Sequence, residues 1–257
     1  MSRLQDSPAA IVGHGMIVKD EGATLLLITQ PDHALLAGTI VAAIQTEPAL
    51  QDVGRDVVLL ATREHDNGWH EVDAAPAVDA STGRPRDFIA GPASMKHALW
   101  LRGIARVAGM HPRAGALVAE HALTVYGYRA HQPAWRDFFA SITSMRDDLL
   151  GQLGITDSPA IETFARDYRV VRLGDALSLQ FCNGWAAPQE TLGYQSFLDG
   201  STLTICPDPF GGATVPLRVL SRRIPARSYI HDGDLAAALS QTIPEVLAGQ
   251  AKGIAVG

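Results

Sequence analysis

The sequence lacks several features that would place it in a special class of protein. Only two of its 257 residues are cysteines, Cys182 and Cys206, and they do not have the C-x-x-C spacing of zinc or redox motifs. Two isolated thiols are typical of a reduced intracellular protein. No run reaches the roughly 18 apolar residues of a membrane helix, and the N-terminus has no signal-peptide pattern. We therefore expect a cytoplasmic protein that does not bind a membrane.

Charge of either sign is also scarce. Lysine and arginine together number 21, aspartate and glutamate 27, and the formal net charge is −6. This balance argues against a nucleic acid as the main partner, since that role usually needs a basic face. A hydrophobic content of 47% with 19% charged residues is typical of a compact globule. We expect a small-molecule substrate as the partner, and leave open whether the protein forms a homodimer.

Apolar periodicity predicts about six helices and few strands. A β-hairpin is expected within residues 15–28. Helices with a period of 3.6 are expected across residues 29–185, most of them opened by proline or a polar residue. Short apolar runs separated by turn residues then predict strands within 200–257. The expected fold is one domain, 1–257, of the mainly α (α+β) class: a helical bundle with a small antiparallel sheet from the hairpin and the C-terminal strands.

The stretch with most chemical information is Leu59–Trp69, which reads LLATREHDNGW. An apolar helical run is expected to bring His65 and Asp66 to its C-terminal end, where Gly68 breaks the helix. Neighbouring side chains on a helix point about 100° apart, so the pair can flank one object there. A metal ion is typical of an imidazole beside a carboxylate, although a histidine in a last helical turn also complements the macrodipole.

A loop of about 25 residues follows, across 67–92, and loops of that length inside a domain are usually functional. Because it starts at the His-Asp pair, we interpret it as a wall or lid over a site. The alternative for its polar residues is a solvated surface loop. Its candidate catalytic or substrate-contacting residues, with one lysine just beyond, are His70, Glu71, Asp73, Arg84, Arg86 and Lys96.

Four further helices each carry a histidine or aspartate among apolar neighbours: His33, His97, His121 and Asp175. Successive candidates are separated by about one helix and a connection, so a bundle could aim them at one point. Each also has an ordinary interpretation. The histidines could be surface groups or buried groups with one local hydrogen bond. Asp175 lies between two leucines and needs a partner if it is buried.

This order of residues, H…HD…H…H…D on successive helices, resembles the HD-domain superfamily of metal-dependent enzymes in its two-metal form. Residues 60–68 are similar to the central motif of that family and 172–179 to its last motif. The resemblance covers 29–185 and implies two divalent transition metal ions, iron first, with Mn, Zn or Co as alternatives. By resemblance, one ion would be held by His33, His65, Asp66 and Asp175. Asp66 would bridge to a second ion completed by His97 and His121.

The segments outside 29–185 look like additions of a small bacterial subfamily. Trp69 stands where many members of the superfamily carry the lysine of His-Asp-x-Gly-Lys. The function implied by the resemblance is hydrolysis of a small phosphoester or nucleotide. Because that lysine is missing, a mixed-valent diiron oxygenase acting on a small polar substrate is a close alternative. A non-catalytic metal- or ligand-binding module is a third.

Overall fold

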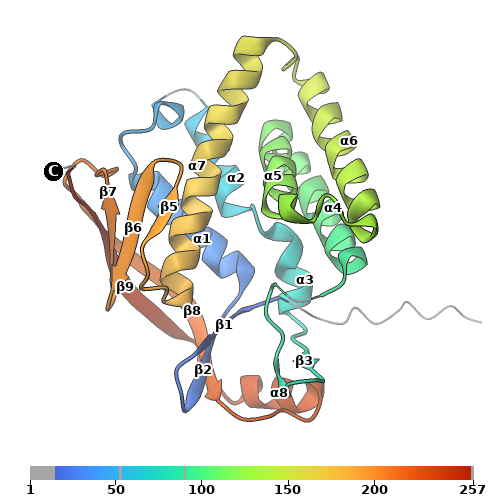
Figure 1. The fold of residues 1–257 in the computed structure, drawn as a ribbon, viewed down its shortest axis with the longest axis vertical. Coiled ribbons are helices and arrows are strands. Elements are labelled where there is room, and N and C mark those ends of the chain that lie inside the picture. The colour runs from blue at the N-terminus through green and yellow to red at the C-terminus, as the bar shows by residue number, and fades with distance from the viewer. Residues whose placement is uncertain (1–14, 52–53, 90, 256–257) are drawn as a thin grey trace, which may run out of the picture.

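The structure, a computed structural model, describes residues 15–51, 54–89 and 91–255. Its centre is a pair of packed helices, α1 (Gln30–Ala43) and α7 (Ser158–Asn183). A seven-stranded sheet curls against one side of this pair, and the other long helices lie on the opposite side (Figure 1). The two central helices are therefore covered on both sides.

The remaining elements have the following bounds. The helices are α2 (Arg55–Arg63), α3 (His70–Asp73), α4 (Ala93–Met110), α5 (Pro112–Val125), α6 (Arg136–Gln152) and α8 (Asp232–Ser240), with 3-10 turns at η1 (Pro48–Leu50), η2 (Asn67–Trp69), η3 (Gly127–Arg129) and η4 (Pro133–Trp135). The strands are β1 (Ile17–Asp20), β2 (Thr24–Ile28), β3 (Val78–Asp79), β4 (Arg84–Pro85), β5 (Gln189–Thr191), β6 (Tyr194–Asp199), β7 (Thr202–Cys206), β8 (Thr214–Pro225) and β9 (Glu245–Gly253).

The sheet has the order β1-β2-β8-β9-β7-β6-β5, and β3 pairs with β4 in a separate ribbon. Neighbours in the large sheet are antiparallel except β7 and β9, which are parallel. Burial alternates along β8, where Val215, Leu217 and Val219 face the core and the residues between them are exposed. One hydrophobic cluster contains these residues together with the apolar faces of α1 and α7.

Local signals explain why the two central helices begin and end where they do. The hydroxyl of Thr29 accepts from the Asp32 N–H at the start of α1, and Pro31 occupies its first turn. Asp157 caps α7 in the same way, and the helix ends at Gly184, whose φ of 70° suits glycine. Both helices were predicted from the sequence, and so was the first hairpin.

The predicted fold class is wrong. The structure is about 52% helical and holds a seven-stranded sheet, so it is a mixed α/β fold and not a helical bundle with a small sheet. Pairing of β2 with β8 joins the N-terminal and C-terminal strands into one continuous sheet. Strands β5 and β6 lie outside the predicted strand ranges. The long strand β9 is rich in Gly, Ala and polar residues, and it is held by ladders to β7 and β8.

The segment after the His-Asp pair also differs from the expectation. The described part of 67–92 contains η2, α3 and the β3–β4 ribbon in place of a long irregular loop. Helix α2 ends at Arg63, before the pair, so Gly68 does not break it. A Cβ at Gly68 would lie 2.5 Å from the Leu99 carbonyl oxygen, so this glycine allows η2 to touch α4. Among the described helices none is long and apolar enough to cross a membrane.

Candidate metal centre

Four buried side chains meet between α1, the end of α2 and the middle of α7; we call them the His-Asp cluster. They are His33 of α1, His65 and Asp66 between α2 and η2, and Asp175 of α7. Both histidines are fully buried, and the carboxylates are 7% and 9% exposed. The two Nε2 atoms are 3.1 Å apart. Asp66 Oδ2 lies 3.4 and 3.3 Å from them, and Asp175 Oδ1 lies 3.2 and 3.4 Å from them.

These distances match the spacing of ligand atoms around one first-row metal ion. Two ligands about 2.1 Å from an ion, at roughly 90 to 109° to each other, are about 3.0–3.4 Å apart. The five measured separations run from 3.1 to 3.4 Å. Imidazole nitrogen with carboxylate oxygen is also a donor set that Zn, Mn, Fe and Co accept. The cluster therefore has the size and the chemistry of a metal site.

Hydrogen bonds behind the cluster orient both imidazoles. His65 Nδ1 lies 2.7 Å from the Thr62 carbonyl, which can only accept, so this nitrogen carries the proton. The Ser178 hydroxyl donates to the Asp175 carbonyl at 3.0 Å and therefore accepts from His33 Nδ1 at 2.8 Å. In their neutral forms both histidines thus direct an Nε2 lone pair at the centre of the cluster. Such support behind a ligand is typical of metal-binding histidines.

The charges of the cluster favour a cation at its centre. Burial alone would lower the pKa of both imidazoles, but the two aspartates raise the pKa of His33 well above its usual value and that of His65 to about 9. Burial alone would likewise raise the pKa of each carboxyl. The facing histidines instead hold the pKa values of Asp66 and Asp175 well below the ordinary range. The cluster therefore holds two ionised carboxylates beside two imidazoles. These four groups can bind either extra protons or a metal ion in place of those protons.

His121 of α5 extends the cluster on one side. Its Nε2 lies 3.7 Å from Asp175 Oδ2, and its ring packs edge-on against His65 at 4.8 Å between centroids. Donor atoms of these three residues lie within 4.8 Å of one another, which makes a second candidate metal group. Burial lowers the pKa of His121 to about 4, so it is neutral at pH 7. Asp175 has one oxygen near His33 and His65 and the other near His121. The resemblance implied that Asp66 would hold this shared position.

His97, the sixth predicted ligand, is not part of either group. Its ring packs near Phe138 at 6.2 Å between centroids, and its Nε2 has no hydrogen-bond partner among the described residues. Consecutive residues of α4 point about 100° apart, and it is the neighbouring Lys96 that faces the cluster side. The structure therefore brings together five of the six residues predicted to bind metal.

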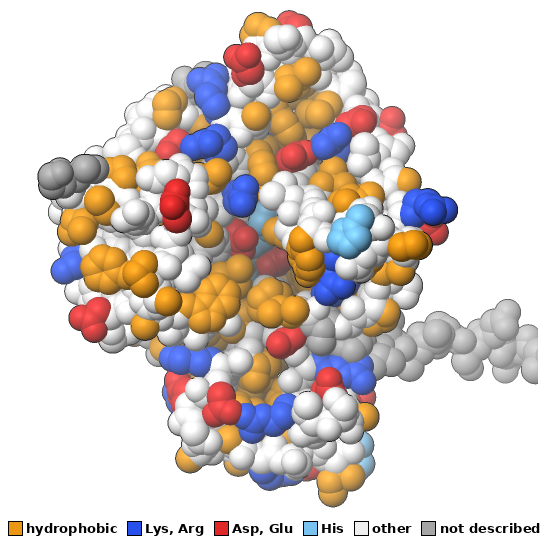
Figure 2. Space-filling view, in the orientation of Figure 1, with side chains coloured by type: hydrophobic (Ala, Val, Ile, Leu, Met, Phe, Trp, Pro, Cys, Tyr) orange, Lys and Arg blue, Asp and Glu red, His pale blue; other side chains and the backbone are white. Residues whose placement is uncertain are grey.

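A cavity of about 140 Å³ lies beside the cluster. Asp66, Asp175 and His121 form the side of this cavity that belongs to the candidate metal groups. Figure 2 shows a hollow near the middle of this face, with acidic and histidine side chains inside it. Most of the remaining wall is aromatic or apolar and includes Trp69, Phe88, Trp100, Tyr126, Tyr128 and Leu179. A small molecule in this cavity would lie next to the candidate ligands.

Lys96, a predicted catalytic residue, lies in the wall of this cavity and is only 1% exposed. Its Nζ donates to the Ile89 carbonyl at 2.7 Å and lies 5.0 Å from the centre of the Tyr126 ring. Burial lowers its pKa to about 8, so the ammonium is still the main form at pH 7. The cavity thus combines a carboxylate-rich side with one buried cation.

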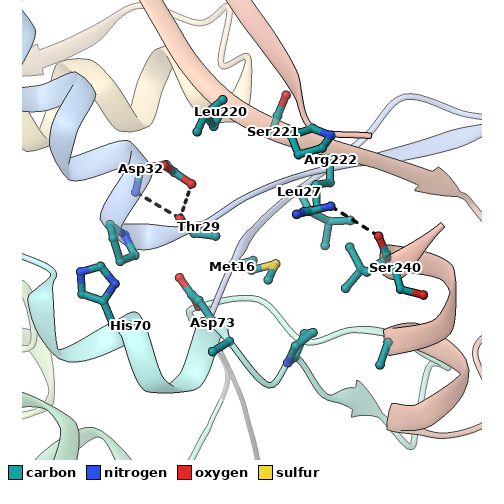
Figure 3. A pocket seen from close by; sticks show the side chains of 16 residues that line it. Met16, Leu27, Thr29, Asp32, His70, Asp73, Leu220, Ser221, Arg222 and Ser240 are labelled. Carbon is teal, nitrogen blue, oxygen red and sulfur yellow. Dashed lines mark hydrogen bonds between the residues drawn. The ribbon is translucent and has the colours of Figure 1, made fainter. Parts of the chain in front are cut away.

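Two other predicted residues, His70 and Asp73, line a different cavity of about 490 Å³ between α3, the start of α1, β8 and α8. Figure 3 shows both on α3, below Thr29 and Asp32. Asp73 Oδ2 accepts from the Gln30 N–H at 2.6 Å and so supports the start of α1. Burial nevertheless raises the pKa of Asp73 to about 8. Neither residue reaches the cavity beside the cluster.

The other charged residues predicted from the loop also lie away from the cluster cavity. Glu71 is exposed and forms ion pairs with Arg102 and Arg106 of α4. Arg84 pairs with Asp20 of β1. Arg86 follows β4 and is absent from the cavity lining.

The sequence analysis missed the residues that support the cluster. Ser178 follows Asp175 by three residues on α7, a spacing that places both on one helix face and could have revealed it. Thr62 contributes a backbone carbonyl, which carries no sequence signal. Gln30 precedes His33 by three residues on α1 and lines the cavity with Trp100.

Fold and cluster together define a mixed α/β protein with a candidate metal centre. Residues 16–225 match the family model DUF3891, described as a protein of unknown function, and the chain belongs to this family. No curated protein and no solved structure matches the chain.

Proposed function

We propose that this protein is a metal-dependent hydrolase that acts on a small substrate, with a phosphoester as the first bond to test. The observation that carries the proposal is the convergence of two oriented imidazoles and two carboxylates at metal-ligand spacing, buried beside a small cavity. A divalent ion held by His33, His65, Asp66 and Asp175 would supply Lewis acidity to a water molecule and to a substrate oxygen.

The side chains around the cavity would have separate tasks. His121 is neutral at pH 7 and faces the cavity, so one of its nitrogens can accept a hydrogen bond and orient a water. The aromatic wall, with Trp69 and Trp100 each 2% exposed, excludes bulk water and strengthens electrostatic contacts inside. Lys96 would provide the positive charge that many members of the HD-domain superfamily carry at the position of Trp69.

A diiron oxygenase is the second candidate. Asp175 turns Oδ1 to His33 and His65 and Oδ2 to His121, so one carboxylate can bridge two ion positions. Two iron ions with a shared carboxylate would supply oxygen chemistry in place of hydrolysis.

The test begins with metal counting. Purified protein is stripped with chelator, reloaded with Mn, Fe or Zn, freed of excess metal by gel filtration and analysed for ions per chain. We expect at least one ion for the wild type, and less than a tenth of that for His65→Ala and Asp175→Asn. The matched control is Asp199→Asn on the exposed end of β6, which should bind like the wild type. Full metal content in both cluster variants would refute the metal site.

Activity assays then separate the two chemistries. A hydrolase releases product from a phosphoester panel with Mn and without oxygen. An oxygenase consumes oxygen only with iron and a reductant. Loaded wild type that does neither on the panel contradicts both assignments and leaves only a metal-binding role.

A further inference from the structure

Three buried nitrogen donors line the cavity beside the His-Asp cluster. They are Lys96 Nζ and Trp100 Nε1 of α4 and Gln30 Nε2 of α1. Lys96 and Trp100 are four residues apart on one face of α4. The three side chains are 1–2% exposed, so bulk water does not solvate them.

Gln30 Nε2 has no acceptor in the described part of the chain, and Trp100 Nε1 has only a poorly placed one, the Tyr126 hydroxyl. The Gln30 backbone is fixed by Asp73, so its side chain starts from an anchored position. Buried donors are normally paired, and an unpaired one is costly. Acceptor atoms from a bound molecule would satisfy both.

The Lys96 ammonium needs an acceptor more than these two neutral donors do, because it is charged as well as buried. Its hydrogen bond goes to the neutral Ile89 carbonyl. Asp87 acts on it as a nearby negative charge and Arg129 as a positive one, but neither residue lines the cavity. Water can satisfy hydrogen-bond donors, but it cannot neutralise a buried charge. The acceptor that fits this wall is therefore an anion.

The charge of the whole site indicates how many negative charges that anion carries. This step rests on the proposed metal function. The two carboxylates of Asp66 and Asp175 balance one divalent ion, and both histidines are neutral when they bind it. Among the residues that line the cavity, Lys96 then leaves a single positive charge, and the charges of Arg129 and Asp87 behind it are of opposite sign. A singly charged ligand would neutralise this charge and a doubly charged one would exceed it.

We propose that the substrate carries a singly charged oxyanion, a carboxylate or a phosphodiester, which Lys96, Gln30 and Trp100 bind beside the metal site. The cavity of about 140 Å³ limits the bound group to a few heavy atoms. The positive charge comes from a helix distant in sequence from the His-Asp pair. The reacting part of the substrate would face Asp66 and Asp175 across the same cavity.

The experiment measures the binding of four small probes to metal-loaded protein at pH 7 by NMR titration. Acetate and dimethyl phosphate carry one charge and represent the two sources of oxyanion. Sulfate carries two charges, and acetamide is the neutral match of acetate. We expect one of the singly charged probes to bind at least tenfold more tightly than sulfate and acetamide. Which of the two binds identifies a carboxylate or a phosphodiester.

Lys96→Met keeps an unbranched apolar side chain of similar length and removes the charge, which lies over the Tyr126 ring. It should weaken binding of the preferred anion at least tenfold and leave acetamide binding and metal content unchanged. Lys252→Met on the exposed face of β9 is the control and should bind like the wild type. Trp100→Phe keeps the aromatic wall and removes one donor, so we expect about threefold weaker anion binding.

Three binding results would each overturn the proposal: tighter binding of sulfate, anion binding that survives Lys96→Met, or no binding of any probe. Loss of metal from Lys96→Met would also contradict it, because Lys96 would then support the cluster. Metal content is measured in the same samples. A wild type that binds acetate through Lys96 but no metal would refute the proposed hydrolase while the anion site stood.

Discussion

His33 and Ser178 are 145 residues apart in the sequence, yet His33 Nδ1 and Ser178 Oγ lie 2.8 Å apart across α1 and α7. The Ser178 proton is committed to the Asp175 carbonyl, one helical turn earlier on α7. The hydroxyl therefore accepts from the imidazole and fixes which nitrogen of His33 faces the cluster. A residue outside the candidate ligand set thus orients a residue inside it.

Ser178→Ala should weaken metal binding without unfolding the protein. Alanine fits the same space, but His33 loses the acceptor that orients its ring, and such losses typically cost about 10- to 100-fold in affinity. The measurement is a competition titration against a chelator. Ser240→Ala, on the exposed end of α8, is the matched control. Equal affinities for wild type and Ser178→Ala would show that Ser178 does not orient the ligand.

The metal-free protein should lose stability as the pH rises above 6.5. The pKa values of His33 and His65 are raised in the folded state, the latter to about 9. Their contribution is complete below the unfolded value of about 6.5 and is lost as pH rises toward 9. The lowered pKa values of Asp66 and Asp175 act at the other end, where stability falls below about pH 4.

Between pH 6.5 and 8.5 we expect the Tm of the metal-free protein to fall by at least about 4 °C. Asp73, whose pKa is raised to about 8, contributes a loss of the same sign, so the scan is repeated on Asp73→Asn. Lys96, whose pKa is lowered to about 8, acts in the opposite direction and offsets only part of the fall expected from the two histidines. Metal replaces the protons, and its stabilising effect should therefore grow over the same range. A Tm of metal-free Asp73→Asn that stays flat from pH 6.5 to 8.5 would disprove the coupling.

Gly103→Ala should destabilise the protein because α4 touches η2 through backbone atoms. A Cβ at Gly103 would lie 2.6 Å from the Gly68 nitrogen, two residues after Asp66. Pushing the two segments apart should cost about 1–3 kcal/mol and shift a cluster ligand. Gly109 is on the same helix with open space around its Cβ position, so Gly109→Ala should be neutral or stabilising. Denaturant unfolding compares the two, and equal effects would contradict the close contact.

The sequence predicted most helices because their signals are local. Thr29, Asp157 and Gly184 act within one turn of the helix ends that they define. The number and length of the strands in the sheet could not be predicted from such local signals. Strand β9 has little apolar periodicity and exists because β7 and β8 pair with it from both sides. Long-range pairing of this kind leaves no pattern in the strand itself.

The candidate site was likewise predicted only in part, because some of its features depend on tertiary packing. Intervals of about one helix indicated that His33, His65 and Asp175 could meet, and in the structure they do. Such intervals do not tell which face of a helix a residue occupies. On α4 a single position separates His97, which packs near Phe138, from Lys96, which lines the cavity. Only the packing of α4 against its neighbours decides between the two.

The number of ions per chain follows from this difference and separates the two candidate chemistries. His97→Ala should keep the full metal content, because His97 belongs to neither candidate group among the described residues. His121→Ala should keep an ion held by the four-residue cluster and lose any second ion that shares Asp175. Metal titration followed by elemental analysis counts the ions in each variant. Loss of an ion from His97→Ala would support the six-ligand arrangement that the resemblance implied. A wild type that never exceeds one ion removes the diiron oxygenase, since that chemistry needs both positions filled.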